Sequence, residues 1–138
     1  MLPTTSRVLL VEDSAVDREA IKLILANLGY KNVVEAVDGI HAIGFLTDPE
    51  RNTPPVEFVI SDWRMAKMSG MDFLKLVRAD ENLKRLPFIL ISTVDDMSEV
   101  LNAIVAGVTD YIVKPITADV LKKKMLAAYL KMSPLPRE

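Results

Sequence analysis

The chain contains no cysteine and a single histidine, His41. The absence of cysteine excludes disulfide scaffolds, zinc ribbons and thiol catalysis. One histidine cannot build a multi-histidine metal site, and it leaves little for a Ser-His-Asp triad. Only five glycines are present, and they form no Gly-rich phosphate loop, which excludes P-loop and dinucleotide-binding sites.

An excess of charge of one sign is also missing. The chain has 17 Lys and Arg against 19 Asp and Glu, a net charge of −2. No basic excess exists to bind nucleic acid without sequence preference, so no nucleic-acid partner is expected. The longest apolar runs, such as residues 125–130 and 88–91, are far shorter than the ~20 residues that span a bilayer. The N-terminus does not have the pattern of a signal peptide. We therefore expect a cytoplasmic protein without a membrane partner.

The 138 residues, half of them hydrophobic, fit one globular domain over residues 1–138. Short apolar runs alternate with longer stretches of helical period. Strands are expected at residues 8–11, 32–36, 57–61, 88–91 and 110–113. Helices are expected at residues 14–28, 38–46, 71–78, 97–107 and 117–132. Residues 133–138 form a short tail without helical continuation, and residues 47–55 form a proline-containing loop.

The alternation of five strands with five helices predicts an α/β fold with helices on both faces of a parallel sheet. The first, third and fourth strands are nearly continuous apolar runs, typical of strands covered on both faces. The second and fifth strands carry more polar residues and are the expected edges. This arrangement agrees with the strand order 2-1-3-4-5 of a doubly wound (βα)5 flavodoxin-like sandwich. In such sheets ligands bind beyond the carboxyl ends of the strands.

Chemically active side chains follow four of these strand ends. They are Glu12 and Asp13 after the first strand, Asp62 after the third, Ser92 and Thr93 after the fourth, and Lys114 after the fifth. Each residue alone has an ordinary explanation, because Asp and Ser commonly begin helices and turns. Together they predict one crevice that holds three carboxylates, one or two hydroxyls and an ammonium group.

Such a crevice favours metal-dependent phosphoryl chemistry. Crowded carboxylates repel one another unless protons or a cation neutralise them. Mg²⁺ suits this set, because it binds through one or two carboxylates, keeps several waters and accepts a phosphate oxygen. Lys114 adds a second positive charge for a phosphoryl group, and an aspartate can act as the nucleophile that forms an acyl phosphate.

The set resembles the receiver domains of CheY-like response regulators in two-component signalling, over a core of about residues 7–132. Glu12 and Asp13 match the family's acidic pair, and Asp62 matches the phosphoacceptor. Ser92 falls at the hydroxyl position, Tyr111 at the aromatic switch position and Lys114, followed by Pro115, at the lysine position.

The resemblance implies a set of roles. Mg²⁺ would be held by Asp13, Asp62 and the backbone carbonyl of Arg64, with Glu12 acting through water. A histidine kinase, a phosphotransfer protein or a small phosphodonor would supply the phosphoryl group. Phosphorylation would draw Ser92 inward and Tyr111 to a buried rotamer, and so remodel the face of the fourth helix, fifth strand and fifth helix. Such a domain is not an enzyme, since it assists only its own phosphorylation and dephosphorylation.

The sequence departs from the family pattern in several places. Ala66 stands where a proline is usual, and Thr93 replaces a small residue beside the hydroxyl. Arg64 and Val94 occupy positions that tune dephosphorylation in the family. The loop over residues 47–55 is longer than in compact members.

Several functional hypotheses stay open at this point. The leading one is a receiver that binds an output protein under phosphorylation control, for example a flagellar motor switch in chemotaxis. The chain could instead be the receiver piece of a larger regulator, cut at residues 133–138. A Mg²⁺-dependent aspartyl phosphohydrolase of the haloacid-dehalogenase type would need Asp-x-Asp where this chain has Glu12-Asp13-Ser14. A degenerate receiver would lack a key residue, and none is missing.

Other conspicuous residues have structural interpretations. His41 and Lys122 to Lys124 are expected to lie on solvated helix faces, and Trp63 is expected to be an exposed loop residue. Met71, Met97 and Met125 fall on apolar helix stripes and are expected to fill the core. In the first helix, Val16, Ala20, Ile24 and Leu28, flanked by Ile21 and Leu25, are expected to form one apolar stripe.

Overall fold

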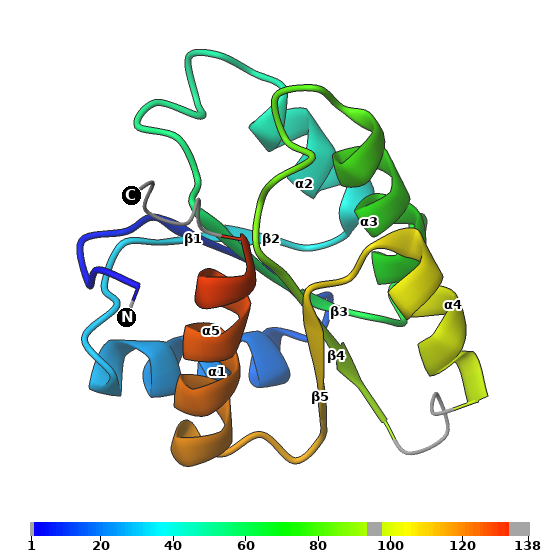
Figure 1. Ribbon diagram of the computed structural model, residues 1–138. Coiled ribbons are helices and arrows are strands. Elements are labelled where there is room, and N and C mark those ends of the chain that lie inside the picture. Colours follow the sequence, from blue (N-terminus) through cyan, green and yellow to red (C-terminus); the bar gives the residue numbers. More distant parts are fainter. Residues whose placement is uncertain (1, 94–97, 133–138) are drawn as a thin grey trace, which may run out of the picture.

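The computed structural model describes residues 2–93 and 98–132, over which strands and helices alternate (Figure 1). The strands are β1 (Val8–Val11), β2 (Val33–Ala36), β3 (Phe58–Asp62), β4 (Phe88–Ser92) and β5 (Asp110–Val113). The helices are α1 (Ala15–Asn27), α2 (Gly39–Leu46), α3 (Gly70–Ala79), α4 (Val100–Ala106) and α5 (Ala118–Met132). The predicted elements are all present, with ends that differ by a few residues.

All neighbouring strands are parallel, in the order β2-β1-β3-β4-β5. The predicted order and the predicted edge strands are therefore confirmed. Helices α1 and α5 cover one face of the sheet, and α2, α3 and α4 cover the other (Figure 1). The result is the predicted doubly wound α/β sandwich.

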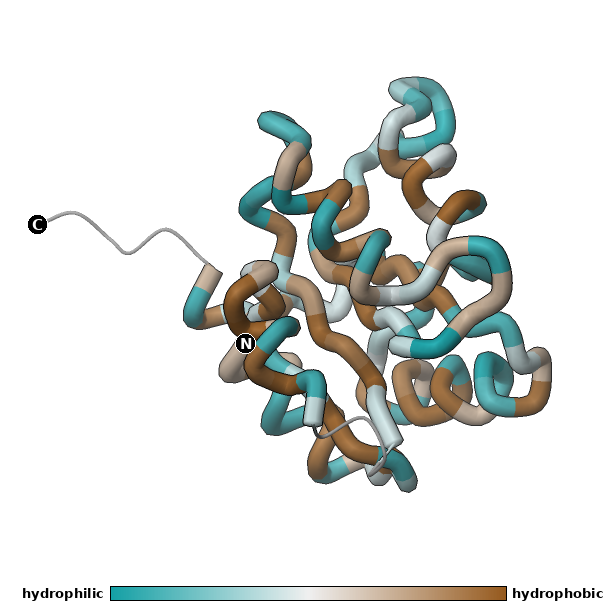
Figure 2. Tube along the Cα trace, turned by 90° about the vertical axis from the view of Figure 1, so that its right-hand side faces the viewer, coloured by the Kyte–Doolittle hydropathy of each residue, from teal (hydrophilic) through white to brown (hydrophobic). Residues whose placement is uncertain are grey.

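Side chains of the central strands alternate between two hydrophobic clusters, as the period of a strand requires. Leu9, Val59 and Leu90 point into the cluster under α2, α3 and α4. Their neighbours Leu10 and Ile60 point into the cluster under α1 and α5. Every residue of β1, β3 and β4 is buried. Figure 2 shows this hydrophobic band running through the strands in the middle of the molecule.

The buried face of α1 is only part of the predicted stripe, namely its flanking residues. Ile21 and Leu25 are the buried residues of this helix, whereas Val16 is 79% exposed and Ala20 is also exposed. Apolar residues cover much of the circumference of α1. Residues four apart therefore form two neighbouring rows, one that begins at Val16 and one that contains Ile21 and Leu25. Contact with β1 and α5 selects the stripe centred on Ile21.

The ends of the helices are closed by capping residues. The Ser14 hydroxyl accepts a hydrogen bond from the Asp17 backbone N–H and begins α1. Gly29 closes that helix with a φ of +101°, a conformation that favours glycine. Thr117 accepts from the Val120 N–H at the start of α5. No helix in residues 2–93 and 98–132 is long and apolar enough to cross a bilayer.

Helix α4 buries very little of its apolar surface. Ala103 is its buried residue, whereas Leu101 is 74% exposed and Val105 is 86% exposed. The apolar residues of this helix therefore lie mostly on its outer side. Two of the methionines predicted to fill the core do so: Met125 is buried, and Met71 packs against the cluster under α2, α3 and α4. Met97 lies outside the described residues.

The predicted loop over residues 47–55 is tied to the amino end of the sheet. Arg7, directly before β1, donates from Nη1 to the carbonyl oxygens of Arg51 at 2.9 Å and Pro54 at 2.7 Å. Its guanidinium also lies 5.0 Å from the centre of the Phe45 ring. These contacts hold the loop at the end of the sheet opposite the predicted crevice.

Helix α3 starts in direct contact with the backbone of Asp62. The Gly70 N–H donates to the Trp63 carbonyl at 2.8 Å. A Cβ at Gly70 would overlap the carbonyl oxygen of Asp62. Glycine at this position therefore lets α3 pack against the end of β3.

We expect Gly70→Ala to destabilise the fold by about 2 kcal/mol, because the added methyl must displace the backbone of β3. Urea unfolding measures the change. Gly44→Ala is the matched control, since a Cβ there meets nothing within 4 Å. Alanine inside α2 should stabilise the fold by roughly 0.5–1 kcal/mol. Equal unfolding midpoints for the two variants would contradict this account of Gly70.

Candidate functional site

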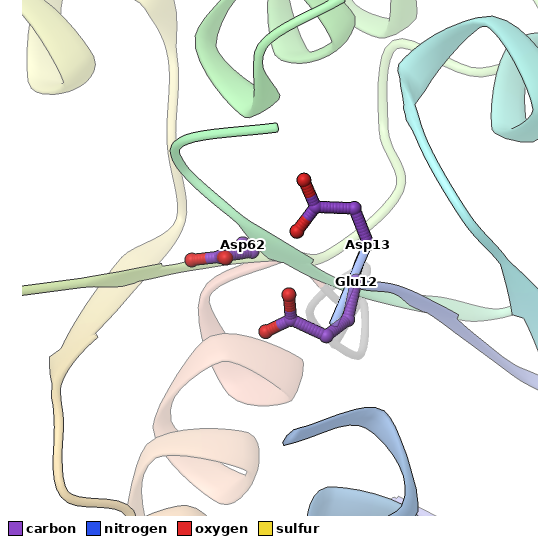
Figure 3. Close-up of side chains that lie close together, drawn as sticks. All are labelled: Glu12, Asp13 and Asp62. Atoms are coloured by element: carbon purple, nitrogen blue, oxygen red, sulfur yellow. The ribbon is translucent and has the colours of Figure 1, made fainter. Parts of the chain in front are cut away.

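The parallel sheet brings the ends of β1 and β3 together. Val11 pairs with Ser61, so the next residues along each strand, Glu12 and Asp62, emerge side by side. Asp13 follows at the rim. One carboxylate oxygen from each of these three residues lies within 4.8 Å of the others (Figure 3). The predicted cluster of carboxylates is therefore present.

Burial differs across the cluster. The Glu12 side chain is 1% exposed and the Asp62 side chain is 12% exposed, whereas Asp13 is exposed. Each carboxylate accepts one backbone N–H: Glu12 from Ser14 at 3.1 Å, Asp62 from Trp63 at 2.9 Å and Asp13 from Ala66 at 3.3 Å. These hydrogen bonds fix the carboxylates but leave most of their negative charge uncompensated.

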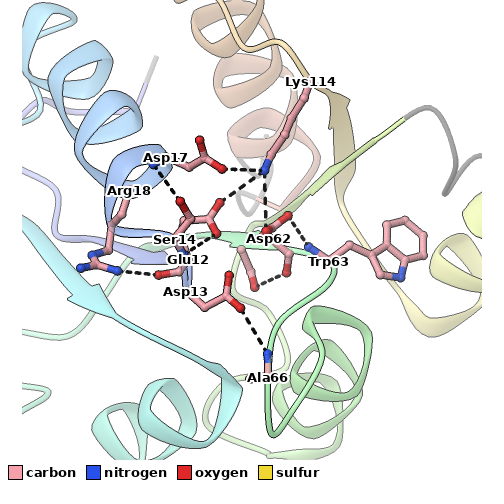
Figure 4. A network of polar contacts seen from close by, with 10 residues as sticks. Glu12, Asp13, Ser14, Asp17, Arg18, Asp62, Trp63, Ala66 and Lys114 are labelled. Atoms are coloured by element: carbon pink, nitrogen blue, oxygen red, sulfur yellow. Dashed lines mark hydrogen bonds and ion pairs between the residues drawn. The ribbon is translucent and has the colours of Figure 1, made fainter.

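Lys114 supplies the positive charge of the crevice. Its Nζ lies 3.5 Å from Glu12 Oε1 and 3.7 Å from Asp62 Oδ2 (Figure 4). It also lies 3.4 Å from Oδ2 of Asp17, on the first turn of α1. The sequence predicted Lys114 at this place and missed Asp17. The signal available for Asp17 was its position one turn after the acidic pair, which is also the position of an ordinary helix-start residue.

The carboxylates shift the acid–base behaviour of the crevice. Burial raises the pKa of Glu12 to about 7, with a further contribution from the negative charge of Asp62. Burial also raises the pKa of Asp62. Burial alone would lower the pKa of Lys114, but the charges of Asp62, Glu12 and Asp17 outweigh it and raise that pKa. The crevice therefore stabilises bound positive charge.

Ser92 and Tyr111 lie on the two strands beside the crevice. Ser92, at the end of β4, is 1% exposed, and its Oγ has no hydrogen-bond partner among the described residues. Its carbonyl accepts the backbone N–H of Lys114 at 2.8 Å. Tyr111, within β5, is half-buried and packs against the cluster under α2, α3 and α4. Backbone pairing thus connects the predicted hydroxyl position directly to the lysine.

Three residues at which the sequence departs from the receiver-domain pattern, Arg64, Ala66 and Thr93, lie around the rim of the crevice. Arg64 is exposed, and its Nη2 lies 3.5 Å from Glu99 Oε2, beside the start of α4. Ala66 donates its N–H to Asp13, and Thr93 is exposed. Val94 lies outside the described residues.

The prediction for Trp63 is wrong, because this residue is only 4% exposed. Its backbone N–H donates to the Ile91 carbonyl and continues the β3–β4 pairing by one residue. The side chain consequently joins the cluster under α2, α3 and α4. Its indole points away from the carboxylates (Figure 4).

The structural interpretations of the other polar residues hold with one exception. His41, Lys122 and Lys123 are exposed, as predicted. Lys124 is instead held by specific contacts. Its Nζ lies 3.0 Å from Asp110 Oδ1 and 5.4 Å from the centre of the Tyr111 ring.

Comparison with known proteins gives a consistent result. Residues 8–126 match the response regulator receiver domain family. The chain is 44% identical over 119 residues to the chemotaxis protein CheY1 of Helicobacter pylori, covering 86% of this chain and 93% of that protein. The structure of the chemotaxis response regulator CheY4 of Vibrio cholerae aligns with a TM-score of 0.78 and 27% identity, over 90% of this chain and 98% of that chain.

A further solved structure is similar to the same extent. It is the receiver domain of a sensor histidine kinase from Pseudomonas aeruginosa, with a magnesium ion coordinated in its active-site cleft. The TM-score is 0.76 and the identity 26%, over 93% of this chain and 98% of that chain. The flavodoxin-like fold and the resemblance found in the sequence are thus confirmed.

The raised pKa of Glu12 predicts how stability depends on pH. In the unfolded chain Glu12 ionises near its ordinary value of 4.5, whereas in the fold it keeps its proton to about pH 7. The folded state binds the additional proton between these values, so stability falls as pH rises through this window. Without metal, we expect a loss of about 1 kcal/mol between pH 6 and pH 8 from Glu12.

Urea unfolding with a chelator at the two pH values measures this change. Glu12→Gln carries no titrating group at this position and should lose most of the pH dependence. A wild-type stability that does not fall over this range, or a Glu12→Gln variant that keeps the full dependence, would refute the assignment.

Proposed function

The chain belongs to the response regulator receiver domain family, and from this premise we propose that Asp62 accepts a phosphoryl group in a Mg²⁺-dependent reaction. The observation that carries the proposal is the crevice itself, where the largely buried Asp62 lies beside Glu12, Asp13 and Lys114. In this proposal the chain acts as a single cytoplasmic receiver domain with its core over residues 7–132. It is a signalling domain, and it assists only its own phosphorylation and dephosphorylation.

The donor set suits Mg²⁺. All the candidate side-chain ligands are carboxylate oxygens, and those of Glu12, Asp13 and Asp62 gather within 4.8 Å. In the proposal Asp13, Asp62 and the backbone carbonyl of Arg64 bind the metal, and Glu12 acts through water. The magnesium ion in the similar receiver domain of the sensor kinase supports this assignment. When bound, Mg²⁺ supplies positive charge that offsets the phosphoryl oxygens.

The protein's own groups account for the transfer step. Asp62 Oδ1 accepts the Trp63 N–H, which leaves Oδ2 facing Lys114. In the proposal, Oδ2 attacks the phosphorus atom, and the bond from phosphorus to the donor's nitrogen or oxygen breaks as the new P–O bond forms. Lys114 pairs with one phosphoryl oxygen, and the Ser92 hydroxyl donates to another. The product is an acyl phosphate on Asp62.

The proposed output is a change of protein-binding surface. The buried Ser92 hydroxyl, which has no hydrogen-bond partner in residues 2–93 and 98–132, would move toward the phosphoryl group, and Tyr111 would turn to a buried rotamer. Both changes adjoin the face of α4, β5 and α5, where Leu101 and Val105 are exposed. A histidine kinase or phosphotransfer protein would supply the phosphoryl group. The similar CheY1 of Helicobacter pylori is a chemotaxis protein, which supports a flagellar motor switch as the output partner.

Phosphorylation by acetyl phosphate with Mg²⁺, followed by intact mass measurement, tests the proposal. We expect one hydroxylamine-labile phosphoryl adduct on the wild type and none on Asp62→Asn, which removes the nucleophile. Omission of Mg²⁺ should reduce the yield of adduct at least tenfold, since the excess negative charge then stays uncompensated. An adduct of equal yield on Asp62→Asn would show that another residue accepts the phosphoryl group.

We expect Ser92→Ala to keep the phosphoryl adduct but to weaken the response of the α4–β5–α5 face. Amide chemical shifts in α4 and β5, with and without beryllofluoride and Mg²⁺, measure that response. Ser6→Ala is the matched control, because Ser6 is also buried and its Oγ also lacks a hydrogen-bond partner among the described residues, but it precedes β1. Identical shift changes in all three proteins would remove Ser92 from the switch.

A further inference from the structure

Lys114 has a carboxylate partner that belongs to neither the predicted metal ligands nor the phosphoacceptor. Asp17 Oδ2 lies 3.4 Å from Nζ, compared with 3.5 Å for Glu12 and 3.7 Å for Asp62. The ammonium therefore lies at least as close to Asp17 as to the residue that it would serve during phosphorylation. Asp17 contacts Lys114 from the outer side, where its own side chain is 49% exposed (Figure 4).

The position of Asp17 is fixed by the first turn of α1. Its backbone N–H donates to the Ser14 hydroxyl at 3.3 Å. The next residue, Arg18, donates to the Glu12 carbonyl at 2.8 Å and pairs with Glu35 of β2 at 3.2 Å. These contacts attach the start of α1 to the ends of two strands. Asp17 consequently holds Lys114 from a rigid base, and a movement of Lys114 has to break or stretch this ion pair.

A phosphoryl group on Asp62 would compete for the same ammonium. It adds oxygens that carry more negative charge than the carboxylate they replace, and Lys114 has to approach them. We propose that Asp17 is a positioning residue that holds Lys114 on the α1 side of the crevice and competes with the phosphoryl group for it. This inference rests on the proposed phosphorylation of Asp62 and adds a residue that sets how readily the phosphorylated site closes.

Binding of beryllofluoride, a phosphoryl mimic, in the presence of Mg²⁺ tests the inference. Trp63 is the only tryptophan of the chain and follows Asp62, so its fluorescence can report the titration. Asp17→Asn should bind the mimic about twofold to fivefold more tightly, the size expected for a partly exposed ion pair. Asp17→Glu keeps the charge and should retain the wild-type affinity.

A second measurement follows Lys114 itself. The ¹⁵Nζ resonance of Lys114 in the metal-free protein should change in Asp17→Asn and stay close to its wild-type position in Asp17→Glu. A residue that only stabilised α1 would not move this resonance selectively. Glu19→Gln is the matched control, because it removes the same charge from an exposed position of α1. It should change neither the Lys114 resonance nor the affinity for the mimic.

Each outcome either supports or overturns the competition between Asp17 and the phosphoryl group for Lys114. Unchanged or weaker binding of beryllofluoride by Asp17→Asn overturns the competition. Equal tightening by Glu19→Gln overturns it as well, since general electrostatics would then explain the effect. A wild type that does not bind the mimic at all overturns the proposed function, and this inference with it. Tighter binding confined to Asp17→Asn, together with the altered Lys114 resonance, supports the inference.

Discussion

The burial of like charges at one edge of the sheet is the constraint on which the rest of this structure depends. Glu12 and Asp62 are largely withdrawn from water and lie beside a further carboxylate, Asp13. Such a group of carboxylates is unfavourable unless protons or positive charges compensate its negative charge. The described residues place one ammonium, that of Lys114, among these carboxylates. These carboxylates lie at the proposed site of phosphorylation, where a bound cation would offset their negative charge.

Other features of the molecule supply the stability that offsets the unfavourable burial of these carboxylates. Every residue of the three central strands is buried, and two hydrophobic clusters hold the sheet from both faces. The register of β1 against β3 fixes the spacing of Glu12 and Asp62, and Gly70 lets α3 pack against the end of β3. Arg7 and the loop over residues 47–55 close the opposite edge. Stability is thus built in the core and at the amino edge, away from the charged crevice.

Much of this arrangement could be predicted from the sequence, because it follows from short-range patterns. Apolar runs marked the strands, and the parallel topology then required the residues after them to converge. The details that depend on packing could not be predicted. The predicted stripe of α1 contained Ile21 and Leu25 at its side, and only the contact of this helix with its neighbours shows that these two residues are buried while Val16 is exposed. Trp63 follows a strand and precedes a loop, and one additional backbone hydrogen bond decides that it is buried.

Charged residues whose partners lie on another element of the fold were missed for a different reason. Asp17 and Lys124 have the composition of ordinary helix surfaces, and only the tertiary structure shows that each faces β5 or its end. Lys114 directly follows β5, while Lys124 contacts Asp110 and Tyr111 within that strand. Because β5 has four residues, a shift of Lys114 and a rotation of Tyr111 involve one short backbone segment. That segment is bonded to the carbonyl of Ser92 through the N–H of Lys114. In the proposal, the short edge strand β5 therefore connects the phosphoryl site to the output face. Asp17 of α1 contacts Lys114 after its carboxyl end, and Lys124 of α5 contacts Asp110 at its amino end.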